Sequence, residues 1–102
     1  MSHVRICALV PDMMDRSRLA SAVAGIEFVT DPDAARGADV IVVDLARRAD
    51  ALATLRALSP TARIVAFGPH VDAARFEAAH RDGADRVLAR SRFFRDIAGS
   101  LA

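Results

Sequence analysis

The sequence predicts an α/β fold in which five parallel strands alternate with helices in a doubly wound sheet. Short apolar runs rich in β-branched residues recur along the chain, and each is followed by a segment with helical spacing of apolar residues. Strict alternation of strands and helices implies right-handed crossovers and hence a parallel sheet. With 102 residues and no linker, repeat or low-complexity stretch, residues 1–102 are expected to form a single domain.

The first strand and the first helix are bounded by specific residues. Residues 3–10 (HVRICALV) form an apolar run that stops at Pro11, as a buried strand does. Residues 13–24 have helical spacing, with Asp12 placed to cap the first turn and Gly25 placed to end the helix. These signals predict the first strand–helix unit.

The middle of the chain is predicted to contain two strands, a helical turn and a helix. Residues 26–30 are a short second strand, and the Asp-Pro pair in residues 31–37 favours a single helical turn. Residues 39–45 (DVIVVDL) contain the continuous apolar run 40–43, which is typical of a central strand covered on both faces. Residues 46–59 have apolar side chains at a spacing of three, which predicts a third helix.

The last part of the chain completes the alternation. Residues 63–68 are the fourth strand, and residues 71–82 are the fourth helix, with Gly83 at its C-terminal end. Residues 86–90 are the fifth strand, and residues 92–101 are the last helix. In that helix three apolar side chains repeat at intervals of four and are expected to face the core: Phe93, Ile97 and Leu101.

Composition excludes several classes of function. Lys is absent, which excludes Schiff-base and P-loop chemistry. The net charge is +1 and Arg and Asp alternate along the chain, so nothing indicates nucleic acid or an anionic membrane as a partner. Cys7, the only cysteine, lies in an apolar run and is expected to be buried. No signal peptide or apolar stretch of about 18 residues is visible, so a cytoplasmic protein is expected.

Small and charged residues follow the predicted strands. Because the carboxyl ends of parallel strands meet at one edge of the sheet, and ligands of such sheets bind there, we expect these residues to lie around one crevice. They are Asp12 after the first strand, Asp44 at the end of the third, Gly68 and His70 after the fourth, and Arg90 after the fifth.

The features that point to a family are the two carboxylates at this edge, the third strand DVIVVDL and the segment GADRVLAR. In these features the chain resembles the receiver domains of bacterial response regulators, over essentially its whole length. The resemblance implies a flavodoxin-like (βα)5 topology with strand order 2-1-3-4-5. It implies that Asp44 is the phosphoacceptor, that Asp12 and Asp44 bind Mg²⁺, and that Arg90 contacts the phosphate. Mg²⁺ favours such oxygen ligands and neutralises charge on a transferring phosphoryl group.

The pattern of that family is only partly present. The loop after Asp44 is shorter than in the family, and five other positions carry a different residue. These losses weaken Mg²⁺ binding, phosphate contact and the readout of phosphorylation. Pro11 stands in place of the second acid, Gly68 of a Thr or Ser, Arg90 of a Lys, Ser91 of a Pro, and Val87 of the switching aromatic residue.

We therefore interpret the chain as a stand-alone receiver-like module for signalling and protein interaction, with a degenerate phosphorylation site and no enzymatic activity. The alternative is a functional phosphoreceiver that is modified at Asp44 with Mg²⁺ in a two-component phosphorelay. A small-ligand binding module of the same topology is disfavoured, because the strand-end loops contain no Gly-rich or Ser/Thr-rich phosphate cradle. No cofactor besides Mg²⁺ is implied.

Each candidate residue also has a simpler interpretation. Asp44 would form an ion pair with Arg90, and Asp12 would only cap a helix. His70 is interpreted as a solvated loop residue and His80 as a packed, neutral histidine. The histidines lack the spacing of a zinc site.

Partners are expected on the face that receivers commonly use, formed by the fourth helix, the fifth strand and the last helix. Phe94 is rotated by about 100° from Phe93 and would anchor a partner if exposed; packing inside is the alternative. Expected partners are signalling proteins, such as a histidine kinase or a downstream effector, and a second copy of the chain. The contact candidates are Arg75, Arg86, Arg92, Phe94 and Arg95, and a network of Arg75, Asp85 and Arg86 would either join two copies or be solvated.

Overall fold

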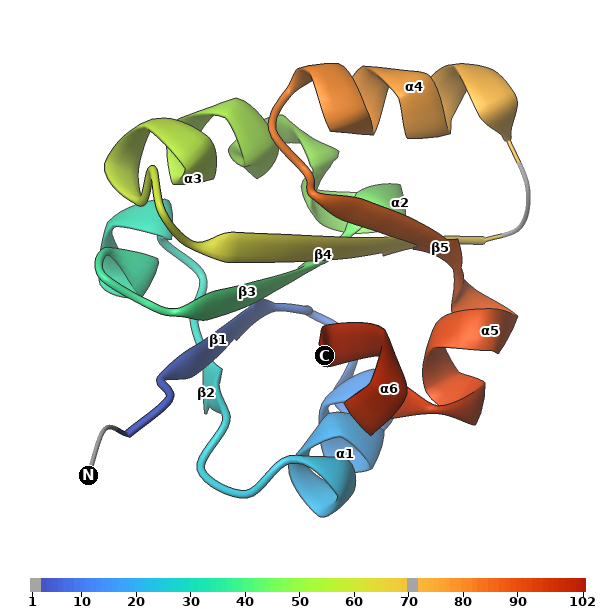
Figure 1. The fold of residues 1–102 in the computed structure, drawn as a ribbon. Helices are drawn as coiled ribbons and strands as arrows, with labels where there is room; N and C mark the ends of the chain where they lie inside the picture. Colours follow the sequence, from blue (N-terminus) through green and yellow to red (C-terminus); the bar gives the residue numbers. More distant parts are fainter. Residues whose placement is uncertain (1–2, 70–71) are drawn as a thin grey trace.

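The computed structural model describes residues 3–69 and 72–102. It contains one five-stranded sheet, and every strand pair in it is parallel (Figure 1). The strand order is 2-1-3-4-5, so the predicted α/β class and flavodoxin-like topology are confirmed. The strands are β1 (Ile6–Leu9), β2 (Glu27–Phe28), β3 (Val40–Asp44), β4 (Arg63–Gly68) and β5 (Arg86–Ala89).

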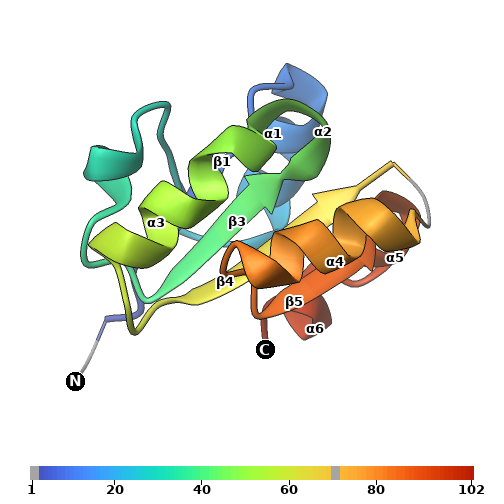
Figure 2. The same ribbon diagram turned by 90° about the horizontal axis from the view of Figure 1, so that it is seen from above.

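Helices cover both faces of this sheet. They are α1 (Met13–Ala22), the 3₁₀ helix η1 (Pro32–Ala35), α2 (Leu45–Arg48), the 3₁₀ helix η2 (Ala49–Ala51), α3 (Leu52–Leu58), α4 (Ala73–Arg81), α5 (Arg90–Arg95) and α6 (Ile97–Leu101). Figures 1 and 2 show α2, α3 and α4 on one face and α1, α5 and α6 on the other. The chain is therefore a three-layer sandwich, as a doubly wound sheet requires.

The core consists of two clusters, one on each face of the sheet. Ile41 and Val43 of β3 belong to the cluster beneath α3 and α4, whereas Val42 belongs to the cluster that contains Phe93 of α5. Successive side chains of a strand point to opposite faces, so a strand covered on both faces is apolar throughout. Cys7 is buried in the first cluster, as predicted.

The segment predicted as one helix over residues 46–59 is broken into α2, η2 and α3. Arg48, the last residue of α2, has a non-helical backbone with φ −131° and ψ 26°. Its guanidinium donates a hydrogen bond to the carbonyl of Thr30 at 2.7 Å. This tertiary contact is not encoded in the apolar spacing, and the prediction of a continuous helix is wrong. Leu52 and Leu55 are nevertheless buried, as the spacing predicted.

The predicted last helix is also broken, at Asp96. The backbone of Asp96 has φ −148° and ψ 80°, and its carboxylate accepts a hydrogen bond from the amide of Gly99 at 2.9 Å. Asp side chains compete with the helix backbone for hydrogen bonds in this way, so Asp96 separates α5 from α6 and caps the second. Phe93 and Ile97 are buried and Leu101 packs against the same cluster, as predicted.

The remaining elements are present with shorter bounds. The first strand begins at Ile6 instead of at residue 3, and the second is reduced to two residues. The fourth strand has the predicted bounds. Within the described ranges, no helix is long and apolar enough to cross a membrane.

Arg56 joins two connections at the amino edge of the sheet. Its guanidinium donates to the carbonyl of Gly83 at 2.7 and 3.1 Å, to the carbonyls of Pro60 and Ala62 at 3.0 and 2.8 Å, and to the Asp85 carboxylate at 2.6 Å. Gly83 has φ +118°, a conformation that glycine adopts at little cost. Arg56 therefore links the segments that precede β4 and β5, at the edge of the sheet opposite the candidate site.

Candidate functional site

Asp12 caps α1 at the carboxyl edge of the sheet. One of its carboxylate oxygens accepts a hydrogen bond from the amide of Asp15 at 2.9 Å. This bond is the main reason that the pKa of Asp12 lies below its ordinary value. The interpretation of Asp12 as a helix cap is confirmed.

Asp44 ends β3 and is buried, with 3% of its surface exposed. Its Oδ1 accepts a hydrogen bond from the amide of Ala46 at 3.0 Å, which caps α2. Burial raises the pKa of Asp44, and the nearby Asp15 carboxylate adds to this, whereas the Ala46 hydrogen bond and the charge of Arg90 oppose it. The carboxyl that was expected to be the phosphoacceptor therefore caps a helix.

Arg90 forms its ion pair with Asp15 and not with Asp44. Its two terminal nitrogens donate to the two oxygens of Asp15 at 2.6 and 3.1 Å. The Arg90 guanidinium also lies 5.6 Å from the ring centre of Phe67 and 5.0 Å from that of Phe94. The expected Arg90–Asp44 ion pair is wrong, because Asp15 on α1 offers Arg90 a bidentate partner.

Sequence reasoning missed Asp15, which is only 3% exposed. It lies three positions after Asp12 and therefore on the same side of the helix, one turn into α1. The spacing of three between Asp12 and Asp15 was the sequence signal that could have added Asp15 to the site. Its pairing with a residue 75 positions away is a tertiary contact that no local pattern reveals.

Gly68 ends β4 beside an aromatic ring. A Cβ atom at Gly68 would lie 3.1 Å from Cε1 of Phe76 and 3.7 Å from Cδ1 of Leu45. The space that a hydroxyl side chain would need here is therefore restricted by Phe76.

Three carboxylates at this edge already accept hydrogen bonds within the chain. Asp12 and Asp44 each give one oxygen to a backbone amide, and Asp15 gives both of its oxygens to Arg90. Among residues 3–69 and 72–102, no group of three His, Cys, Asp or Glu side chains is placed to hold a metal ion. Mg²⁺ is usually bound by one or two carboxylates together with waters, and at this edge the Arg90 guanidinium already balances the charge of Asp15.

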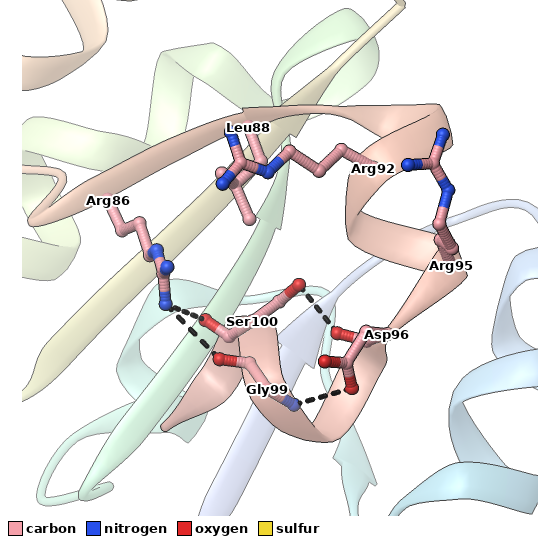
Figure 3. A pocket seen from close by; sticks show the side chains of 7 residues that line it. All are labelled: Arg86, Leu88, Arg92, Arg95, Asp96, Gly99 and Ser100. Atoms are coloured by element: carbon pink, nitrogen blue, oxygen red, sulfur yellow. Dashed lines mark hydrogen bonds between the residues drawn. The ribbon is translucent and has the colours of Figure 1, made fainter.

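The partner-face candidates do not form a single patch. Arg86, Arg92 and Arg95 line a depression between β5, α5 and α6, which Figure 3 shows. Arg75 lies on α4, on the opposite face of the sheet (Figure 1), and its nearest acidic group is Asp72, at 3.9 Å. The fold therefore places three of the predicted partner-contact arginines at one depression and the fourth, Arg75, on the other face of the sheet.

Two members of the expected dimer network have partners within the chain. Asp85 forms an ion pair with Arg56 at 2.6 Å. Arg86 donates to the carbonyls of Gly99 and Ser100 at 3.2 and 3.3 Å, as Figure 3 shows. These contacts give both side chains a role inside the fold.

Phe94 is half-buried, between the two predicted alternatives. Its ring lies edge-on to those of Phe67 and Phe93, with centroids 5.2 and 5.0 Å away. The guanidinium of Arg18 lies 5.2 Å from the Phe94 centroid. One part of the ring therefore packs in the core, and the rest contributes to a basic surface.

His80 is exposed, and the prediction that it packs in the core is wrong. Ala79 and Phe76 supply the core side of α4, and His80 lies about 100° round the helix from Ala79. Its Nδ1 lies 3.0 Å from the carbonyl oxygen of Ala84. His70 lies outside the described residues.

Sequence comparison alone assigns no family to the chain. No family model matches it, and no curated protein matches it significantly.

Solved structures with this fold include response regulators and a CheY-like protein. A response regulator from Burkholderia pseudomallei with a phosphorylated aspartic acid matches with a TM-score of 0.82 at 21% identity, over 98% of this chain and 67% of its own. The phosphorylated cyanobacterial phytochrome response regulator RcpA gives 0.78 at 16% identity, over 96% and 91%. The CheY-like protein tadZ from Pseudomonas aeruginosa PAO1 gives 0.76 at 17% identity, over 95% of each chain. These likenesses confirm the receiver fold that the sequence predicted.

Proposed function

We propose that this chain is a receiver-like signalling module that acts by binding other proteins and does not depend on phosphorylation of Asp44. In this proposal it is not an enzyme, it needs no cofactor, and it works in the cytoplasm with signalling proteins as partners. The fold, shared with response-regulator receivers, supports the signalling role. The contacts of Arg90, Asp44 and Gly68 at the carboxyl edge of the sheet support the second part of the proposal, that the protein works without phosphorylation of Asp44.

The observation that carries the proposal is the bidentate pair of Arg90 and Asp15. Arg90 is the basic residue at the position expected to contact a phosphoryl group, and its charge is already balanced by a carboxylate. To bind a phosphoryl group through the same two N–H groups, Arg90 would have to release Asp15, which would then be an unpaired buried charge. Such a separation is costly, because a buried carboxylate without a partner loses both water and its counter-charge.

The two other groups at this edge support the same conclusion. The Asp44 carboxyl is buried and caps α2, so modification would disturb a helix that begins directly after β3. Gly68 has no hydroxyl to approach a phosphate, and Phe76 restricts the space for one.

The alternative is a phosphoreceiver, and two structures with this fold that carry phosphorylation favour it. In that case an Asp44 oxygen attacks the phosphorus of a donor, and the donor's leaving group departs with the bonding electrons. The attacking carboxylate must be ionised, which the raised pKa of Asp44 opposes.

The test is the intact mass of the wild type and of Asp44→Asn after incubation with acetyl phosphate, with and without Mg²⁺. Asn keeps a side-chain oxygen that can cap α2, so the variant is expected to fold. The proposal predicts no added phosphoryl group in either protein. A Mg²⁺-dependent addition to the wild type that is absent from Asp44→Asn would establish the alternative, whereas equal addition to both would indicate modification elsewhere.

A further inference from the structure

Five arginines gather on the face of the molecule that carries α1, α5 and α6. They line two neighbouring depressions of about 210 and 400 Å³, and Arg95 contributes to both. The smaller depression, between β5 and α6, also contains Asp96 and Leu88, and the larger one contains Ser91 and Phe94. We call this region the arginine surface; its basic residues are Arg18, Arg86, Arg90, Arg92 and Arg95.

The arginine surface concentrates positive charge in a chain whose net charge is only +1. Five of the 14 basic residues line it together with one carboxylate, which leaves nine arginines and twelve acidic residues for the rest of the chain. The sequence suggested evenly distributed charge, because these arginines are interspersed with acidic residues along the chain. Folding places them side by side.

Three of these guanidiniums have no hydrogen-bond or ion-pair partner among the described residues. Arg90 is paired with Asp15, and Arg86 donates to carbonyls of α6. Arg18, Arg92 and Arg95 are exposed, and within residues 3–69 and 72–102 they form no hydrogen bond or ion pair. Figure 3 shows the side chains of Arg92 and Arg95 leaving α5 in different directions. Their donors are therefore available to an external acceptor.

Phe94 makes part of this surface rigid. Its ring is held by Phe67 and Phe93, and the guanidiniums of Arg18 and Arg90 lie against it at 5.2 and 5.0 Å from its centroid. A cation–π contact of this kind favours a position of the Arg18 guanidinium over the Phe94 ring. A side chain that is already ordered loses less conformational entropy when it binds a ligand.

We propose that the arginine surface binds an acidic segment of a partner protein. Two adjoining shallow depressions with separated guanidiniums suit an extended chain with several carboxylates better than one small anion, which an enclosed pocket would surround. Arg guanidiniums form bidentate hydrogen bonds with carboxylates. The half-buried ring of Phe94 adds apolar contact area, which a peptide with both acidic and apolar side chains would use. This inference rests on the proposed role in protein binding and specifies the chemistry of the partner.

The experiment measures binding of a fluorescein-labelled peptide of Glu and Leu residues by fluorescence anisotropy at physiological salt. The test protein is Arg92→Glu/Arg95→Glu. The matched control is Arg63→Glu/Arg81→Glu, which changes the net charge equally at two exposed arginines that line neither depression. We expect the wild type and the control to bind within about twofold of each other and the test protein to bind at least about tenfold more weakly.

Three results would overturn the inference. They are absence of binding by the wild type, equal weakening in the test and control variants, and displacement of the peptide from the wild type by a single-stranded oligonucleotide that binds more tightly, which would indicate nucleic acid as the ligand. The acetyl phosphate experiment is read separately. If the wild type is phosphorylated at Asp44 and still binds the peptide, only the prediction that Asp44 is not modified is contradicted. If the wild type is not phosphorylated and does not bind the peptide, only the inference about the arginine surface is contradicted.

Discussion

Arg90 and Asp15 lie 75 positions apart in the chain and form two parallel hydrogen bonds at the carboxyl edge of the sheet. The Asp15 side chain is 5% exposed and that of Arg90 is 38% exposed, so the pair is half-way between a surface ion pair and a buried one. It connects the first turn of α1 to the first residue of α5. Its removal is therefore expected to weaken the contact between the first and last parts of the chain.

We predict that Asp15→Asn lowers the free energy of unfolding by about 2 kcal/mol, because a partly buried guanidinium loses its counter-charge. The measurement is urea unfolding followed by circular dichroism. The control is Asp33→Asn, in an exposed pair with Arg36, where a change below about 0.5 kcal/mol is expected. An equal decrease in the free energy of unfolding in the two variants would mean that the Arg90–Asp15 pair stabilises the fold no more than an exposed ion pair does.

We predict opposite pH dependences for Asp44→Asn and Asp12→Asn. The folded pKa of Asp44 is raised above its ordinary value of 3.8, so ionisation destabilises the native state as pH rises from 3.8 through that higher pKa. Asn has no such ionisation, and its stability relative to wild type should increase across this window. The measurement is urea unfolding at a series of pH values from below 3.8 to neutrality.

Asp12 provides the reverse case in the same experiment. Its folded pKa is lowered, so its ionised form stabilises the native state above 3.8, and this contribution is lost as pH falls through the folded pKa. Asp12→Asn should therefore lose stability relative to wild type as pH rises towards 3.8. The same sign for both variants would contradict the environments assigned to these carboxyls.

We predict that Gly68→Ala destabilises the protein by about 1 kcal/mol, because the new methyl group meets the Phe76 ring. In a Phe76→Leu background the cost should be smaller, with a coupling of about 1 kcal/mol between the two substitutions. A double-mutant cycle in urea measures this coupling. Additive effects would show that the ring moves aside without cost.

We predict that Gly83→Ala is more destabilising than Gly25→Ala. Both glycines have positive φ, +118° and +76°, and strain of about 1 to 2 kcal/mol is expected at each. Only at Gly83 would the added Cβ collide with a neighbour, since it would lie 2.7 Å from Cβ of Arg56. Thermal unfolding of the two variants makes the comparison, and similar melting temperatures would mean that Arg56 can shift.

The sequence predicted the fold because each strand carries its own apolar signal and the alternation with helices fixes a parallel sheet. It therefore placed Asp12, Asp44 and Arg90 at one edge correctly. It did not predict that Arg90 pairs with Asp15, because that choice depends on which carboxylate the guanidinium reaches in three dimensions. Local hydrogen bonding of Asp96 overrode an apolar repeat that continues through it, which is why the last helix is broken.

The guanidinium of Arg56 holds the carbonyls of Pro60, Ala62 and Gly83 and the carboxylate of Asp85 from a single side chain. A lysine ammonium has three donors on one atom and lacks the planar, forked geometry that reaches acceptors in several directions. Replacement of Arg56 by Lys would therefore remove several of these contacts at once. The chain contains no lysine, and at position 56 the structure requires the several donors of an arginine.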